Sequence, residues 1–311
     1  MNSHAPIFRT DASASERLRL AIGIASTGRR EILQAILPQI ARQTRIPDEI
    51  VICVACPGDA DEVWCRELGL AVNVVSASRG LCCQRNKILR NVPEADILLF
   101  LDDDFLMAPS YLEELEKLFQ SNTDVVMSTG TVKLDGILGP GIPVSEGLRI
   151  VDTLPAIGIE ADDVIPVSSA YGCNMAVRMS VLRNADLWFD ENLPLYSWLE
   201  DVDFSGQIAP YGLIVRSNRL RGVHLGAKRG RMSGVRFGYS QIANPIYMVR
   251  KRTMSRRFAA AQLIRNLTAN AVKVFRPEPW VDRKGRLIGN ARALADLVRG
   301  RLAPTNITSI E

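Results

Sequence analysis

The chain has 311 residues, of which 47% are hydrophobic and 23% are charged, and this composition is typical of a globular rather than a disordered protein. Its strongly apolar runs, such as residues 97–101, are far shorter than the ~20 residues that a membrane-spanning helix needs. The polar N-terminus through Arg17 lacks the apolar core of a signal peptide. We therefore expect a cytoplasmic protein with a disordered segment over residues 1–17.

The net charge of +4 is unevenly distributed along the chain. From Arg219 to the end there are 20 basic and 4 acidic residues, which leaves 18 of the 38 basic and 30 of the 34 acidic residues before it. A basic region of this kind usually faces a polyanion, either an anionic membrane or a nucleic acid.

Strands alternate with helices in the first part of the chain. Apolar residues alternate over residues 18–24, recur at helical spacing over 31–43 and form an extended run over 49–54. The same order continues with a helix at 61–68, a strand at 71–75, a helix at 82–90 and a buried strand at 97–101. This alternation predicts an α/β fold with a Rossmann-like, mostly parallel sheet and helices on both faces.

The second part of the chain changes character twice. A helix at 110–120 and a strand at 125–129 are followed by residues 136–166, whose Gly and Pro content and poor periodicity predict irregular structure. Beyond Arg231 we expect no further strands. Three basic helices are predicted there, at 239–254, 257–274 and 287–302.

Three carboxylates, Asp102, Asp103 and Asp104, directly follow the buried strand. A parallel sheet binds ligands at the carboxyl ends of its strands, and clustered carboxylates repel one another unless a hard cation such as Mg²⁺ or Mn²⁺ lies between them. The alternative is a solvated acidic turn or a helix N-cap.

A second acidic cluster, Glu200 and Asp201, follows Trp198 and begins a predicted helix that runs through Ile208. Such a pair can simply cap the helix. His224 is one of only two histidines, and it is either a structural residue or a neutral imidazole that completes a metal site.

Residues 79–86 combine a Gly turn with a basic, amide-rich helix start. Gly80, Arg85 and Asn86 are suited to holding phosphate or ribose oxygens. The six cysteines, four of them in Cys53-x-x-Cys56 and Cys82-Cys83, invite a zinc interpretation. The second pair has no spacer and the first lies in a strand, so we expect reduced, mostly buried thiols instead.

In this order, the motifs resemble the inverting family 2 glycosyltransferases of the GT-A fold, over residues 18–226. The resemblance implies that Asp104 binds the metal, that Asp102 contacts the nucleotide and that Asp201 is the general base. It also implies an acceptor-side segment at residues 172–175 and a metal-binding role for His224, as in some members of that family.

The resemblance implies transfer of a sugar from a nucleotide-diphosphate-sugar to an acceptor hydroxyl, with Mn²⁺ or Mg²⁺ as cofactor. Many relatives end the second strand with an Asp that binds uracil, whereas here Asp59 or Asp61 would have to replace it. The expected residues are, for catalysis, Asp201 and Glu200; for the donor, Ser26, Thr27, Arg30, Gly80, Arg85, Asn86, Asp102 and Asp103; for the acceptor, Gly172, Asn174 and Trp198; and for the metal, Asp104 and His224.

The expected organisation is a catalytic domain over residues 18–230, with a nucleotide-sugar half over 18–130 and an acceptor half over 131–230, and a basic helical extension over 231–311. An acidic sugar-transfer domain has little use for nucleic acid. The extension is therefore expected to bind an anionic membrane or to pack on the catalytic domain.

The expected process is assembly of surface polysaccharide or glycolipid, with the protein peripheral on the inner face of the plasma membrane. Two alternatives remain open. One is a sugar nucleotidyltransferase, for which residues 26–30 are a poor version of the required Gly-rich basic loop. The other is a non-catalytic, nucleotide-binding scaffold recruited to membranes.

Overall fold

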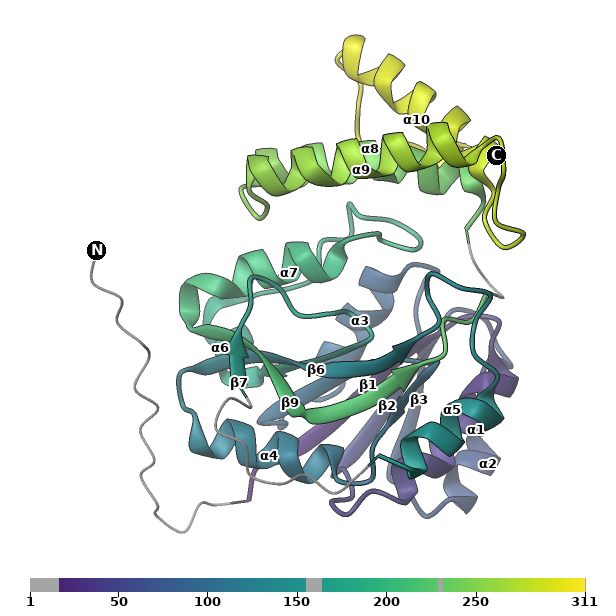
Figure 1. Cartoon of the computed structure of the whole chain (residues 1–311). Helices are drawn as coiled ribbons and strands as arrows, with labels where there is room; N and C mark the ends of the chain where they lie inside the picture. The colour runs from purple at the N-terminus through teal and green to yellow at the C-terminus, as the bar shows by residue number, and fades with distance from the viewer. Residues whose placement is uncertain (1–16, 155–163, 229–231, 311) are drawn as a thin grey trace.

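A nine-stranded mixed sheet organises the first part of the chain (Figure 1). The computed structural model describes residues 17–154, 164–228 and 232–310. The strand order is β3-β2-β1-β4-β8-β6-β9-β5, and β7 pairs with β9. The strands are β1 (Leu20–Ser26), β2 (Glu49–Val54), β3 (Val72–Ser76), β4 (Ile97–Asp102), β5 (Phe105–Met107), β6 (Val125–Asp135), β7 (Val164–Pro166), β8 (Asn174–Arg178) and β9 (Leu213–His224).

Most strands of this sheet run in one direction. Strands β1 to β4 are parallel neighbours, β8 is antiparallel to both β4 and β6, and β6 is parallel to β9. Only β5, β7 and β8 therefore oppose the others among the strands that the structure describes. The predicted mostly parallel α/β sheet is confirmed.

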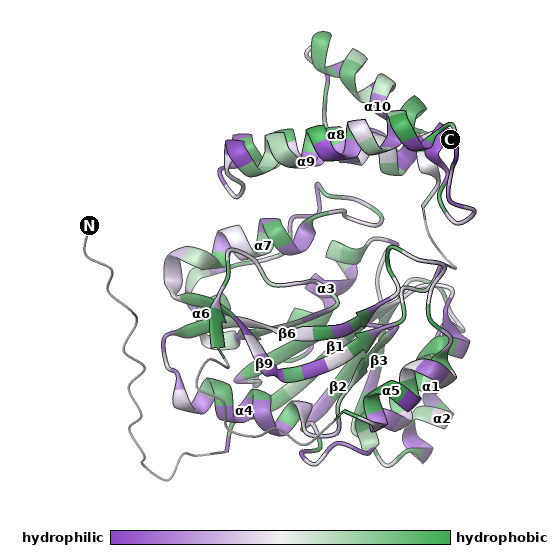
Figure 2. Ribbon diagram, viewed as in Figure 1, coloured by the Kyte–Doolittle hydropathy of each residue, from purple (hydrophilic) through white to green (hydrophobic). Residues whose placement is uncertain are grey.

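Helices cover both faces of the sheet, as the sequence predicts (Figure 1). One hydrophobic core joins the sheet to α1, α2 and α4, and another joins it to α3, α6, α7 and α8. Figure 2 shows apolar residues concentrated in the sheet between these layers. The helices of this part are α1 (Arg30–Ala41), α2 (Glu62–Glu67), α3 (Leu81–Arg90), α4 (Tyr111–Ser121), α5 (Val144–Asp152), α6 (Met179–Ala185) and α7 (Glu200–Ile208).

Residues 136–166 are not irregular throughout, so that prediction is wrong in part. Helix α5 lies within them because Gly147 packs without a side chain against Leu106 and Leu225, and Val151 is buried in the same cluster. Strand β7 ends the segment, and residues 155–163 lie outside the described residues. Strand β6 continues to Asp135, six residues beyond the predicted end.

A three-helix extension follows the sheet and lies over one of its faces (Figure 1). Its helices are α8 (Gly234–Lys251), α9 (Arg256–Lys273) and α10 (Arg283–Val298). The absence of strands beyond residue 231 holds for residues 232–310. Helix α8 begins five residues earlier than predicted because Ser233 caps it by accepting a hydrogen bond from the Arg236 N–H. Helix α10 likewise begins at Arg283, where Asp282 is the cap.

Other expectations about the chain have mixed outcomes. The predicted disorder of residues 1–17 and the boundary between residues 230 and 231 fall almost entirely on residues that the structure does not describe. Four of the six cysteines are buried and all are free thiols, as expected. In the described ranges, no helix combines the length and apolar character needed to cross a bilayer.

Candidate active site

A cavity of about 330 Å³ lies at the carboxyl ends of β1, β4 and β9, between the sheet and the start of the helical extension. This is the edge at which a parallel sheet presents residues to a ligand. The polar and aromatic residues that line the cavity are Thr27, Arg29, Arg79, Gln84, Arg85, Asp102, Asp103, Asp104, Tyr171, Tyr196, Trp198, Glu200, Asp201, His224 and Arg236.

The parallel pairing of β1 and β4 positions the first wall of the cavity. Ala25 pairs with Asp102, so Ser26 lies beside Asp103, and the Ser26 hydroxyl donates to Asp103 Oδ2 at 2.7 Å. The Arg29 guanidinium donates to Asp103 Oδ1 at 2.8 Å. Asp103 is thus held by two side chains and is 3% exposed, and these bonds tie the acidic turn to the end of β1.

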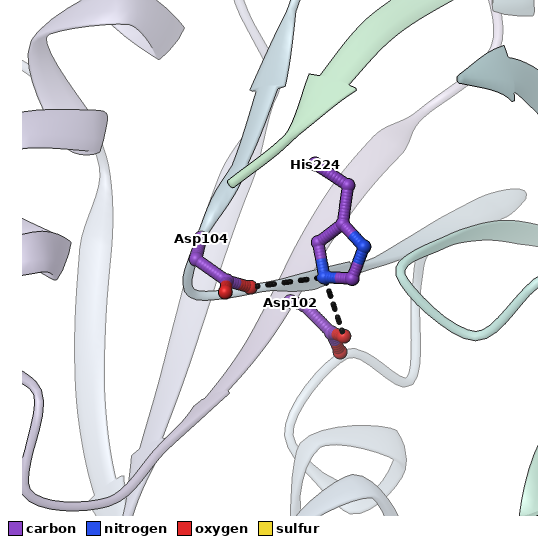
Figure 3. Close-up of side chains that lie close together, drawn as sticks. All are labelled: Asp102, Asp104 and His224. Atoms are coloured by element: carbon purple, nitrogen blue, oxygen red, sulfur yellow. Dashed lines mark ion pairs between the residues drawn. The ribbon is translucent and has the colours of Figure 1, made fainter. Parts of the chain in front are cut away.

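Asp102, Asp104 and His224 converge from β4, the following turn and the end of β9 (Figure 3). One ligand atom from each lies within 4.8 Å of the other two. His224 Nε2 is 3.4 Å from Asp104 Oδ1 and 3.9 Å from Asp102 Oδ2. Among the residues described, this is the group whose side chains could hold a metal ion.

A partner behind the imidazole supports a metal at this position. His224 Nδ1 is 2.9 Å from Asp135 Oδ1, and the Tyr171 hydroxyl donates to Asp135 Oδ2 at 3.0 Å. When a metal replaces the proton on Nε2, the other proton stays on Nδ1 facing Asp135, and the Nε2 lone pair points toward Asp102 and Asp104. Metal-binding histidines are oriented in this way, and carboxylate ligands suit a hard cation such as Mn²⁺ or Mg²⁺.

The electrostatics of the cluster favour a cation. Burial alone lowers the pKa of His224, but hydrogen bonds to Asp104 and Asp135 and the charges of Asp104 and Asp102 raise it to about 10. Burial raises the pKa of Asp102. For Asp104, burial also acts to raise the pKa, but the hydrogen bond and the charge of His224 lower it overall. The carboxylates therefore hold a positive charge on His224 in the metal-free protein, and a divalent cation can supply positive charge in its place.

Arg85 links the acidic turn to helix α7 from inside the protein. It is 2% exposed, pairs with Glu200, and donates to the Gly172 carbonyl oxygen at 2.8 Å. It also lies 3.4 Å from Asp102 Oδ1. Burial raises the pKa of Glu200 to about 8 although the Arg85 charge opposes the shift. These contacts make Arg85 and Glu200 a buried pair that joins the two acidic motifs.

Asp201 is the second residue of α7 and lines the cavity. Its Oδ2 accepts a hydrogen bond from the Gly172 N–H at 2.9 Å, and its Oδ1 accepts one from the Val202 N–H at 2.8 Å. A Cβ on residue 172 would lie 3.0 Å from Glu200 Oε1 and 3.3 Å from Asp201 Oδ2, so glycine permits this close approach. Burial raises the pKa of Asp201, which makes the carboxylate a better proton acceptor than a solvated aspartate.

Backbone strain is concentrated just before Asp201. Leu195, Ser197 and Leu199 have φ values of 59°, 52° and 71°, a left-handed conformation that non-glycine residues seldom adopt. They alternate with Tyr196 and Trp198, which line the cavity and whose rings pack against Phe237. The strained backbone therefore places two aromatic residues in the lining of the cavity that contains Asp201.

Eleven of the fifteen residues expected at the site line this one cavity. The other four are Ser26, Arg30, Asn86 and Asn174, and the side chain of each bonds to another group of the protein, Ser26 to Asp103 of the cavity. Arg30 pairs with Asp61, Asn86 bonds to the backbone of Phe189, and fully buried Asn174 accepts from the Gly130 N–H at 2.8 Å. Neither Asp59 nor Asp61 lines the cavity, and both accept hydrogen bonds from nearby backbone N–H groups.

The sequence analysis missed several residues that line the cavity, among them Arg29, Gln84, Tyr171 and Arg236, and also Asp135, which lies behind His224. Arg29 and Gln84 lie next to expected residues in the same loops, so a wider reading of those motifs would have included them. Asp135, Tyr171 and Arg236 have no local signal, because each reaches the site through a long strand, a crossing loop or the helical extension.

Comparisons with known proteins agree with this geometry. The sequence model for "Glycosyl transferase family 2" matches residues 21–184, more than half of the chain. A search of curated proteins found no match.

Solved structures show the same fold at low identity. TarS of S. aureus has a TM-score of 0.56 at 14% identity, and the alignment covers 92% of this chain and 82% of that one. A mannosyltransferase from Pyrobaculum calidifontis, solved with GDP-Man and Mn²⁺, has a TM-score of 0.56 at 15% identity, with 98% and 88% covered. GalNAc-T7, solved with UDP, GalNAc and Mn²⁺, has a TM-score of 0.53 at 12% identity, with 92% and 59% covered. With its GT-A fold and its matched residues, the chain belongs to glycosyl transferase family 2.

Proposed function

We propose that this glycosyltransferase moves a sugar from a nucleotide-diphosphate-sugar to an acceptor hydroxyl, with inversion at the anomeric carbon. The observation that carries the proposal is that Asp201 lines the same cavity as Asp102, Asp104 and His224. One part of the cavity can then hold a metal-bound diphosphate while another holds the base. We assign catalysis to residues 18–230 and treat residues 231–311 as an extension.

The proposed metal ligands are Asp104 and His224, with Asp102 on the nucleotide side. A bound Mn²⁺ or Mg²⁺ would neutralise the diphosphate and stabilise it as a leaving group. The mannosyltransferase and GalNAc-T7 structures that share the fold contain Mn²⁺ together with GDP-Man or UDP, which supports this assignment. Asp135 keeps His224 oriented toward the two carboxylates.

Asp201 is the proposed general base. It accepts the proton of the acceptor hydroxyl while the hydroxyl oxygen bonds to the anomeric carbon. The bond from that carbon to the phosphate oxygen breaks, and the nucleoside diphosphate leaves on the opposite face. No covalent enzyme intermediate forms, so the single displacement inverts the anomeric centre. Glu200 positions the base by joining the start of α7 to Arg85.

The other expected residues that line the cavity are assigned either to the donor or to the acceptor. We propose that Thr27, Gly80 and Arg85 lie along the donor, and that Gly172 and Trp198 lie along the acceptor. The net positive charge of the extension supports an acceptor at an anionic membrane, in polysaccharide or glycolipid assembly on the inner face of the plasma membrane.

The test is a screen of UDP-sugars and GDP-sugars with Mn²⁺ or with a chelator. Thermal stabilisation of the protein and release of nucleoside diphosphate are measured together. We expect one donor class to stabilise the protein only with metal, and Asp104→Ala to remove that stabilisation while Asp152→Ala on α5 retains it. Release of pyrophosphate from a nucleoside triphosphate and a sugar phosphate would instead identify a nucleotidyltransferase. Absence of binding by every donor would refute the transfer reaction.

A further inference from the structure

Helix α9 exposes a stripe of apolar side chains and buries two amides. On its buried side, Gln262 is 8% exposed and Asn270 is fully buried. On the opposite side, Ile264 is 66% exposed, Val272 is 65% exposed, and Phe275, just after the helix, is 85% exposed. Their spacing places these three residues on one stripe. A helix that only packs on its own protein has the reverse arrangement.

Buried amides fix the rotation of this helix. The Asn270 side-chain amide donates to Gln241 Oε1 of α8 at 2.8 Å and to Asn290 Oδ1 of α10 at 2.9 Å. Leu263 and Leu267 pack into the same interface. Turning the exposed stripe inward would leave buried amides without partners, which is costly. The apolar stripe therefore stays at the surface in the folded protein.

The charges on helix α9 have one sign. The helix contains four basic residues, Arg256, Arg257, Arg265 and Lys273, and no acidic residue, and Lys273 pairs with Glu278 beyond its end. Arg256 and Arg257 are exposed and form no ion pair with any residue in the described part of the chain. A partner of this surface must offer negative charge and apolar volume together. Nucleic acid offers the charge, but its phosphate backbone offers nothing apolar for Ile264 or Val272 to enter.

We propose that the outer face of α9, formed by Ile264, Thr268, Val272 and Phe275 with the basic residues around it, docks on an anionic lipid leaflet. The apolar side chains enter the boundary between headgroups and acyl chains, and the arginines contact lipid phosphates. Figure 2 shows apolar residues recurring along α9, outside the sheet domain. This binding goes beyond the proposed transfer reaction, since it requires neither donor nor metal.

Helix α8 connects α9 to the catalytic part of the protein. Its Asn244 amide donates to the Trp198 carbonyl oxygen at 2.8 Å, and its Lys251 lies 2.7 Å from Asp190 and Asp203. Near its other end, Arg236 lines the cavity. The extension therefore contacts the active site through α8 and would contact the leaflet through α9, so docking would hold the active site near the membrane.

The experiment is flotation of the full-length protein with vesicles, in the absence of donor and metal. Vesicles of phosphatidylcholine with phosphatidylglycerol are compared with phosphatidylcholine alone, at low and high salt. We expect binding only to the anionic vesicles, and weaker binding at high salt. Arg256→Gln with Arg257→Gln should lower the partition coefficient about 30-fold at low salt, and Ile264→Ser with Val272→Ser about 10-fold or more.

Val63→Ser is the matched control, because Val63 lies on helix α2 and is 65% exposed, like Val272. It should bind as the unchanged protein does, and circular dichroism should show that all variants fold. No binding of the unchanged protein to anionic vesicles would overturn the proposal, as would equal binding by Ile264→Ser with Val272→Ser. Sedimentation velocity adds one more decisive outcome: a dimer that these serine substitutions dissociate would assign the face to a second copy of the chain.

Discussion

Asp135 Oδ1 lies 2.9 Å from His224 Nδ1, and the two residues are register partners at the ends of the parallel strands β6 and β9. The sheet itself therefore sets the orientation of the imidazole. A carboxylate behind a histidine fixes the tautomer that can bind a metal through its other nitrogen.

Replacing Asp135 should weaken metal binding although Asp135 is not itself a proposed metal ligand. We expect Asp135→Ala to lower the affinity for Mn²⁺ by roughly 10-fold to 100-fold, with Asp135→Asn intermediate. Electron paramagnetic resonance of free Mn²⁺ measures this directly and needs no donor. Asp152→Ala, in an exposed position on α5, is the control. Unchanged affinity in Asp135→Ala would show that the sheet alone holds His224 in place.

The stability of the metal-free protein should fall as the pH rises from about neutral to about 10. His224 has its pKa raised from 6.5 to about 10 in the folded state by Asp104 and Asp135, against the effect of burial. Its stabilising contribution is complete below pH 6.5 and disappears as the pH rises through the folded value.

Urea unfolding in the presence of a chelator, at several pH values in that range, measures the effect. His224→Gln should remove this component of the pH dependence and leave the titration of other groups. With Mn²⁺ present the trend should reverse, because the metal displaces the proton and binds more tightly as the pH rises. Identical pH profiles for the unchanged protein and His224→Gln would contradict the raised pKa.

Loss of the proposed base should separate binding from transfer. We expect Asp201→Asn to retain metal-dependent donor binding and to lower kcat by roughly 10²-fold or more, since an amide cannot accept the proton. Asp104→Ala should weaken donor binding as well. Calorimetry of donor binding and single-turnover transfer are measured on the same preparations. Full transfer by Asp201→Asn would remove that residue as the base.

Removing Arg85 should destabilise the whole fold. Arg85→Ala leaves Glu200 buried without its partner and also removes the hydrogen bond to the Gly172 carbonyl, so we expect a loss of about 3–5 kcal/mol in the free energy of unfolding. Arg66→Ala is the control, because Arg66 is a surface residue whose pairing with Glu62 contributes less than about 1 kcal/mol. Equal denaturation midpoints for the two variants would show that the buried pair is not structural.

The sequence predicts the parts of the site that depend on local order. The buried strand before Asp102 is an unbroken apolar run, so its carboxyl end, and with it the acidic turn, can be located from the pattern alone. Asp201 is located in a similar way, because it lies in the first turn of a helix that the sequence predicts.

The sequence does not predict which way a side chain points or which residues far apart in the chain come into contact. Arg29 and Arg30 are neighbours after β1, yet Arg29 turns to Asp103 and Arg30 turns outward to Asp61. Asn174 has a polar side chain that could bind a ligand, but its Oδ1 accepts a hydrogen bond from the backbone of β6 instead. Strand β9 mixes basic and apolar residues so evenly that its role in bringing His224 to Asp104 emerges only from the sheet.

The buried amides of Gln241, Asn270 and Asn290 also give the helical extension a single alignment. Sliding α9 by one turn, about 5.4 Å, would separate Asn270 from Gln241 and Asn290. Buried amide atoms of all three residues would then lack their hydrogen-bond partners. Purely apolar helices can slip past one another at little cost, whereas these cannot. Substitutions on the outside of α9 consequently leave the alignment of the three helices intact, so they change what this face binds and not how the extension folds.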